Sequence, residues 1–180
     1  MRCSACGALL LLLAGCSLPP LRGKAEVGKD PYAVFVADGP GGSAVFAPLP
    51  TGGPPIPITF SPVQESAPSL SPDGAIVAFL RGEDTASSRP RGVWLLNLLS
   101  GAEREVSIPA ELHADPDRVG WSGDGRTLYI SSGRRTLRTP VPPARLAVEA
   151  VPASDRPAAD SAFMVLLGAP AFAHAVPAFH

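Results

Sequence analysis

The sequence predicts an all-β domain built from about three small antiparallel sheets. The chain of 180 residues contains 22 prolines and 18 glycines, a composition that favours short strands and frequent turns over long helices. Short runs of β-branched and aromatic residues lie between these turn residues, as strands do. Two turns also share the pattern Ser-x-Asp-Gly, beginning at Ser71 and Ser122. The two turns are 51 residues apart, and the strands around Phe35 and Phe79 are 44 residues apart. Internal similarity at about this period is typical of a repeat architecture (roughly 20–50 residues per repeat).

The N-terminal segment has the features of a secretion signal. A positive charge at Arg2 precedes an apolar core at Leu9–Leu13, which is far shorter than the roughly 20 apolar residues of a membrane-spanning helix. Leu13-Ala14-Gly15-Cys16 resembles the lipobox of bacterial lipoproteins. In that family the cysteine thiol is alkylated with diacylglycerol, the preceding segment is removed, and the new amino group is acylated. The resemblance implies cleavage between Gly15 and Cys16 and lipidation of Cys16. An ordinary signal peptide that happens to contain a cysteine is the alternative.

Cysteine usage agrees with this interpretation. Cys3 and Cys6 lie inside the expected signal, so Cys16 is the only cysteine of the mature chain and no disulfide can form. Cys3 and Cys6 form a C-x-x-C pair, but no second pair accompanies it, so a metal or redox role is disfavoured. Ser17 stands where an Asp would favour retention at the inner membrane in the lipoprotein family. We therefore expect a lipid-anchored protein of the bacterial cell envelope, at the outer membrane facing the periplasm or at the cell surface.

The chain divides into four parts by composition. We expect a lipoprotein signal peptide at 1–15, a lipidated cysteine with a flexible tether rich in proline and glycine at 16–30, and β-repeats at 31–145. The remainder, 146–180, is a proline- and alanine-rich tail of uncertain structure, in which Phe163–Leu167 suits a final strand.

The repeats begin with a hairpin of Tyr32–Val36 and Ala44–Ala47 around a glycine-rich turn. Two further units place strands on both sides of a Ser-x-Asp-Gly turn, in which Gly takes positive φ without a Cβ clash and Asp accepts bonds from the turn's own amides. Their expected strands are Ile76–Leu80, Gly92–Leu98, Glu103–Val106, Arg118–Trp121, Thr127–Ser131 and Thr136–Val141. Small repeated sheets of this kind fit the blades of a β-propeller best.

The second unit, Pro68 to Val106, resembles the WD40-like (PD40) repeat of the periplasmic TolB-type propellers. The hallmark of that repeat is a Ser-Pro-Asp-Gly turn, here Ser71, Pro72, Asp73 and Gly74. Val119 to Val141 is similar to a weaker copy with Ser122, Asp124 and Gly125, in which Gly123 replaces the proline. The first hairpin would be a partial copy without the turn. The resemblance implies structural turn residues and carries no catalytic residue with it.

Three blades are too few for a closed ring, which usually has four to eight. The expected fold is therefore a partial, open β-propeller whose terminal blades expose apolar faces and strand edges. Self-association, a partner that completes the ring, or truncation of a longer ancestor would each resolve this exposure.

No catalytic group, metal site or cofactor site is expected. The net charge of −1 argues against a nucleic-acid surface. The run from Gly120 to Asp124 lacks the last glycine of a nucleophile elbow, and the histidines have no metal-ligand spacing. Asp115-Pro116-Asp117 continues with Val119 where a calcium loop needs a ligand.

Two classes of function remain. The favoured one is a non-catalytic envelope lipoprotein whose blade-type domain binds a protein or cell-wall partner. The alternative is a truncated or accessory propeller domain derived from a larger envelope protein or from a serine peptidase, since related propellers precede peptidase domains.

Overall fold

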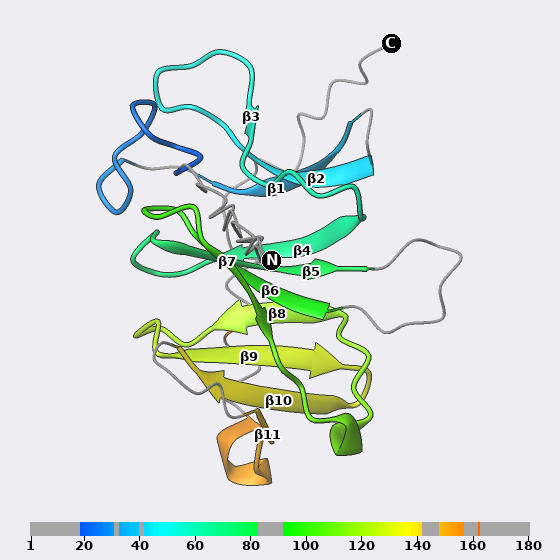
Figure 1. Cartoon of the computed structure of the whole chain (residues 1–180). Coiled ribbons are helices and arrows are strands. Elements are labelled where there is room, and N and C mark those ends of the chain that lie inside the picture. The colour runs from blue at the N-terminus through cyan, green and yellow to red at the C-terminus, as the bar shows by residue number, and fades with distance from the viewer. Residues whose placement is uncertain are drawn as a thin grey trace, which may run out of the picture.

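The computed structural model describes residues 19–30, 33–39, 42–82, 92–141, 148–156 and 162. These form three antiparallel sheets (Figure 1). The first has the order β1-β2-β3, the second β4-β5-β6-β7 and the third β11-β10-β9-β8. The strands are β1 (Phe35–Gly39), β2 (Gly42–Ala47), β3 (Ile56–Pro57), β4 (Glu65–Leu70), β5 (Ile76–Arg81), β6 (Gly92–Asn97), β7 (Glu103–Val106), β8 (Arg118–Trp121), β9 (Thr127–Ser132), β10 (Arg135–Pro140) and β11 (Glu149–Ala150). The predicted all-β fold of about three antiparallel blades is confirmed.

The elements differ from the expected ones mainly at the edges of the sheets. Two short 3₁₀-helices, Ala110–Leu112 and Ala153–Asp155, follow the second and third sheets. The sequence did not single out β3, a two-residue strand within a proline-rich passage that pairs with the end of β2. The strand expected at Phe163–Leu167 lies outside the described residues.

The middle sheet is buried on both faces because successive side chains of a strand point to opposite sides. In β5, Val77 and Phe79 pack into a cluster shared with the first sheet, whereas Ala78 and Leu80 pack into a cluster shared with the third. All four are fully buried. The three sheets therefore stack side by side, as propeller blades do, with β5 at the centre of the stack (Figure 1).

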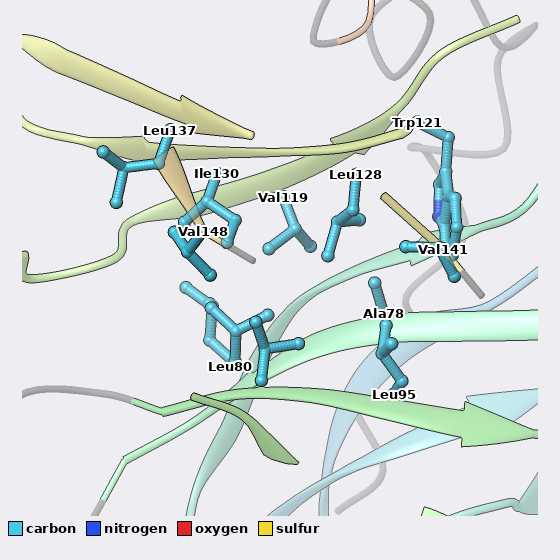
Figure 2. Close-up of a cluster of buried hydrophobic side chains, with 12 residues drawn as sticks. Ala78, Leu80, Leu95, Val119, Trp121, Leu128, Ile130, Leu137, Val141 and Val148 are labelled. Carbon is cyan, nitrogen blue, oxygen red and sulfur yellow. The ribbon is translucent and has the colours of Figure 1, made fainter. Parts of the chain in front are cut away.

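The core between the second and third sheets is almost entirely aliphatic (Figure 2). Ala78, Leu80 and Leu95 of the middle sheet face residues of the third sheet and of the segments next to it. These are Val119, Trp121, Leu128, Ile130, Leu137, Val141 and Val148. The Trp121 indole also donates a hydrogen bond from Nε1 to the Ser69 carbonyl oxygen at 3.1 Å. Trp121 therefore links neighbouring blades through both packing and a polar contact.

The core between the first and second sheets includes a residue from the expected tether. Leu21 is only 1% exposed and packs with Val45, Ile58 and Phe79. The backbone from Pro19 to Asp30 is a succession of turns closed by bonds such as Ala25 N–H to Leu21 C=O at 3.2 Å. We expected a flexible tether over 16–30, but Pro19–Asp30 lies against the blades, because Leu21 has an apolar site there to fill.

The far face of the third sheet differs from the corresponding face of the second. Tyr129 follows Ser122 at the same spacing as Ala78 follows Ser71, so the two residues occupy equivalent positions in their sheets. Their cross-strand neighbours, Arg138 and Leu95, are equivalent as well. Tyr129 packs against Ala162 and Val151, and Arg138 pairs with the carboxylates of Glu149 and Asp155. The segment after β10 thus covers part of this face.

Candidate functional site

The two Ser-x-Asp-Gly turns have the same hydrogen bonds, atom for atom. In the first, the Ser71 hydroxyl donates to Asp73 Oδ1 at 2.6 Å and accepts from the Ile76 amide at 2.9 Å. Asp73 Oδ1 also accepts from the Ala75 amide at 3.0 Å. The Gly74 amide closes the turn by donating to the Ser71 carbonyl at 2.8 Å, with φ of +70° at Gly74.

The second turn repeats this arrangement although a glycine replaces the proline. The Ser122 hydroxyl donates to Asp124 Oδ1 at 2.6 Å and accepts from the Thr127 amide at 2.9 Å. Asp124 Oδ1 accepts from the Arg126 amide at 3.0 Å, and Gly125 has φ of +69°. The geometry therefore depends on Ser, Asp and Gly, and the proline at position two is dispensable.

These hydrogen bonds also keep both aspartates ionised. The Ser71 hydroxyl, followed by the Ala75 amide, lowers the pKa of the Asp73 carboxyl, because both groups donate to its charged form. The Ser122 hydroxyl, followed by the Arg126 amide, lowers the pKa of Asp124 in the same way. Each carboxylate has its donors within its own turn, so its local role is to hold the turn.

The two Ser-x-Asp-Gly turns lie next to each other, and the N-terminal turns approach the first of them. A Cβ atom at Gly125 would lie 3.5 Å from Cδ of Pro72, and one at Gly28 would lie 3.1 Å from the Asp73 carbonyl oxygen. The sequence-predicted residues Ser71, Pro72, Asp73, Gly74, Ser122, Asp124 and Gly125 thus gather at one end of the sheets. Gly15 and Cys16, the expected cleavage and lipidation residues, lie outside the described residues.

A buried ionic cluster that the sequence did not suggest joins the first two blades. The Glu65 side chain is completely buried, and its Oε1 accepts from Arg81 Nε at 3.0 Å and Nη2 at 2.7 Å. Its Oε2 accepts from the Thr59 hydroxyl and from the Val45 amide, the latter at 3.3 Å. Arg81 Nη2 also lies 2.8 Å from Glu103 Oε2.

Aromatic rings complete the surroundings of Arg81. Its guanidinium carbon lies 4.4 Å from the centre of the Trp94 ring and 5.1 Å from that of Phe79, distances at which a cation–π attraction operates. Every polar atom of the Glu65 carboxylate has a partner, and no buried side-chain nitrogen or oxygen within the described residues lacks one. The cluster is therefore a satisfied link between blades. The sequence carries no local signal of it, because Glu65 and Arg81 meet only through the pairing of β4 with β5.

An open groove of about 570 Å³ lies where the N-terminal turns meet the first two blades. It is lined by Pro19, Pro20, Ile58, Phe60, Leu96, Gly101 and Glu103. Phe60 is 78% exposed, and Leu99, in the same β6–β7 turn as Gly101, is 62% exposed. Two large hydrophobic side chains are therefore exposed at or beside this groove.

Two further structural findings concern this described part alone. Across its residues, no three His, Cys, Asp or Glu side chains gather closely enough to hold a metal ion. None of the helices described there is long and apolar enough to cross a membrane.

The fold is similar to that of solved propellers. A scan against protein-family models finds no match, and a search of curated proteins finds no significant relative. Among solved structures, a putative TolB from Agrobacterium tumefaciens aligns over 67% of this chain and 42% of its own, with 21% identity and a TM-score of 0.53. TolB from Acinetobacter baumannii aligns over 68% of this chain and 30% of its own, with 13% identity and a TM-score of 0.50.

The propeller domain of the Trilobed protease from Pyrococcus furiosus is also similar, at 14% identity and a TM-score of 0.45 over 68% of this chain and 40% of that one. The chain thus spans less than half the length of each of these structures. At these identities the similarity establishes the fold and nothing further. The described residues form part of a β-propeller of the kind seen in TolB.

Proposed function

We propose that the chain is a bacterial envelope lipoprotein, anchored through Cys16, whose propeller-type domain binds a protein partner without catalysing a reaction. The observation that carries the proposal is the segment Leu13-Ala14-Gly15-Cys16 behind an apolar core of signal-peptide length. Its localisation follows from the anchor: the outer membrane facing the periplasm, or the cell surface.

The use made of the polar residues supports a binding role. The Ser and Asp side chains of the two turns bond within their own turns, and Glu65 is fully engaged by Arg81 and its other donors. Their chemistry therefore serves the architecture of the blades, which offers a rigid surface for recognition.

The outer face of the first sheet is the surface that we assign to the protein partner. Phe35 of β1 stacks on Phe46 of β2 with ring centres 6.1 Å apart, and Phe35 is 37% exposed. Exposed aromatic residues on a flat sheet are typical of protein interfaces. A second copy of the chain and a different envelope protein are both compatible with this surface, as is the partner that would complete a propeller ring.

Anchoring is tested by labelled fatty-acid incorporation. Wild type should incorporate the label, and Cys16→Ala should lose it and remain unprocessed. Equal labelling of the two proteins would overturn the anchor. Cys16→Ser is a matched control for size and should also lose the label, since a hydroxyl does not form the thioether.

Partner binding is tested by photocrosslinking in whole cells. A photoreactive phenylalanine analogue at position 35 should yield one discrete crosslinked species, identified by mass spectrometry. The same analogue at exposed position 134, in the β9–β10 turn, serves as control. Indistinguishable crosslinking patterns at the two positions would contradict the assignment of the binding face.

This chain covers 42% and 30% of the two TolB structures, and this partial coverage favours one further candidate function. The chain would then be an accessory or truncated propeller derived from a larger envelope protein or a serine peptidase. Peptidase turnover by the purified fragment Ser17–His180 would favour the peptidase origin and contradict the non-catalytic role.

A further inference from the structure

We propose that the groove end of the domain lies directly on the lipid bilayer, with Phe60 and Leu99 in the interfacial region of the membrane. We call the surface formed by Pro19, Pro20, Phe60 and Leu99 the apolar rim. The inference rests on the proposed lipidation of Cys16, and it goes beyond anchoring by fixing which face of the domain meets the membrane.

The first step is the reach of the chain. Pro19, which lines the groove, is the third residue after Cys16. An extended chain advances at most about 3.6 Å per residue, so three residues span about 11 Å. The thioether holds Cys16 at the boundary between headgroups and acyl chains. Each headgroup region is about 5–7 Å deep, so Pro19 cannot lie far beyond the headgroups.

The second step is that the domain cannot swing away from this point. Leu21 is buried between the first two blades, and the Lys24 and Ala25 amides both donate to its carbonyl oxygen. The ordered domain therefore begins within five residues of the lipidated cysteine. A long flexible tether would leave orientation free, whereas this short connection brings the groove end to the membrane.

The third step is the exposure of large hydrophobic side chains at this end. Phe60 and Leu99 are the two most exposed of the large hydrophobic residues in the described chain, at 78% and 62%. Phe60 lines the groove together with Pro19 and Gly101, and Leu99 precedes Gly101 by two residues in the same turn. Aromatic and aliphatic residues at one edge of a domain suit the membrane interface.

The charge at the same end is mixed, and its exposed basic residues can interact with anionic lipids. Arg22 and Lys24 are exposed on the N-terminal turns, and basic residues next to a membrane are attracted by anionic headgroups. Glu103, the acidic residue that lines the groove, is paired with Arg81. Because Arg81 also pairs with the buried Glu65, these three side chains together carry one negative charge beside the groove.

The test uses the absence of other cysteines from the mature chain. Phe60→Cys and Leu99→Cys, each expressed with its signal sequence, are labelled with a nitroxide after reconstitution into phosphatidylethanolamine–phosphatidylglycerol vesicles. Arg134→Cys, an exposed turn position between β9 and β10, is the matched control. Collision rates with oxygen and with a water-soluble nickel complex then report the depth of each label.

We expect the oxygen-to-nickel collision ratio at positions 60 and 99 to exceed that at position 134 several-fold. Equal ratios at all three positions in lipidated protein would overturn the membrane-facing rim and leave the anchor intact. Label stoichiometry separates the two proposals, because a lipidated and processed chain takes one label. A chain with a free Cys16 thiol takes two labels if the signal segment has been removed, and four if Cys3 and Cys6 remain. More than one label per chain would overturn the anchor, and the inference with it.

Discussion

The guanidinium of Arg81 holds the buried carboxylate of Glu65 through two hydrogen bonds, from Nε at 3.0 Å and from Nη2 at 2.7 Å. The same carboxylate accepts from the Val45 amide of the neighbouring sheet. One acidic side chain therefore connects β4 to its partner strand β5 and to the adjacent blade. Removing a single member of such a buried set leaves an uncompensated charge.

We expect Arg81→Leu to lower the free energy of unfolding by about 3–5 kcal/mol, because Glu65 would keep its burial and lose its cation. Urea denaturation measures the change. Arg138→Leu is the matched control, since the Arg138 pairs with Glu149 and Asp155 are partly exposed and should contribute only about 0–1 kcal/mol. Similar losses in the two variants would show that the burial of Glu65 carries no special cost.

Gly123→Pro should stabilise the domain by about 0.4–1 kcal/mol by restricting the unfolded chain. Pro72 occupies the equivalent position in a turn with the same hydrogen bonds, and a Cβ at Gly123 would meet no atom within 4 Å. Thermal unfolding of the variant and wild type gives the comparison. A lower melting temperature for the variant would mean that the backbones of the two turns differ at this position.

Gly125→Ala should destabilise the domain by about 1–2 kcal/mol, because φ of +69° is unfavourable for a residue with a Cβ atom. The added methyl group would also lie against Pro72 of the preceding blade. Gly123→Ala, which adds the same methyl group to open space, is the control for urea denaturation. An unchanged midpoint for Gly125→Ala would contradict the left-handed conformation.

Stability should fall in acid because of the two turn aspartates. The pKa of Asp73 and of Asp124 is lower in the folded state than the ordinary value, so the unfolded chain binds these protons first. Their contribution is present above about pH 4, the ordinary range of Asp, and is lost as the pH falls through the lower folded values. The free energy of unfolding should be measured from about two pH units below to about two above the ordinary pKa of Asp. It should fall less steeply with decreasing pH in the Asp73→Asn, Asp124→Asn double variant than in wild type. A decline as steep as that of wild type would assign the acid sensitivity to other carboxyls.

Leu21→Ala should cost about 2–5 kcal/mol, as expected for the loss of a buried leucine. The result would demonstrate that the N-terminal turns belong to the folded domain. Leu99→Ala, at an exposed position, should change stability by less than about 0.5 kcal/mol in the absence of membranes. A loss of stability as small as this for Leu21→Ala would indicate that residues 19–30 are a tether and not part of the folded domain.

The turns and strands could be predicted because their causes are local. Ser71, Asp73 and Gly74 determine their turn through bonds that span no more than five residues, and the apolar runs beside it set the strands. Glu65 could not be predicted as buried, because its burial depends on Val45, Thr59 and Arg81, which only the folded chain brings together. The burial of Leu21 could not be predicted either, because the prolines and glycines around it are typical of a tether. Its side chain nevertheless reaches the core.

The outer faces of the first and third sheets differ. We expect this difference to decide on which face a further blade packs. Another blade stacked on the third sheet would have to displace Ala162 from Tyr129 and take Arg138 away from its two carboxylates. At the first sheet, within the described part of the chain, Phe35 stacks on Phe46 and remains 37% exposed. We therefore expect a neighbouring blade to pack more readily on the first sheet than on the third.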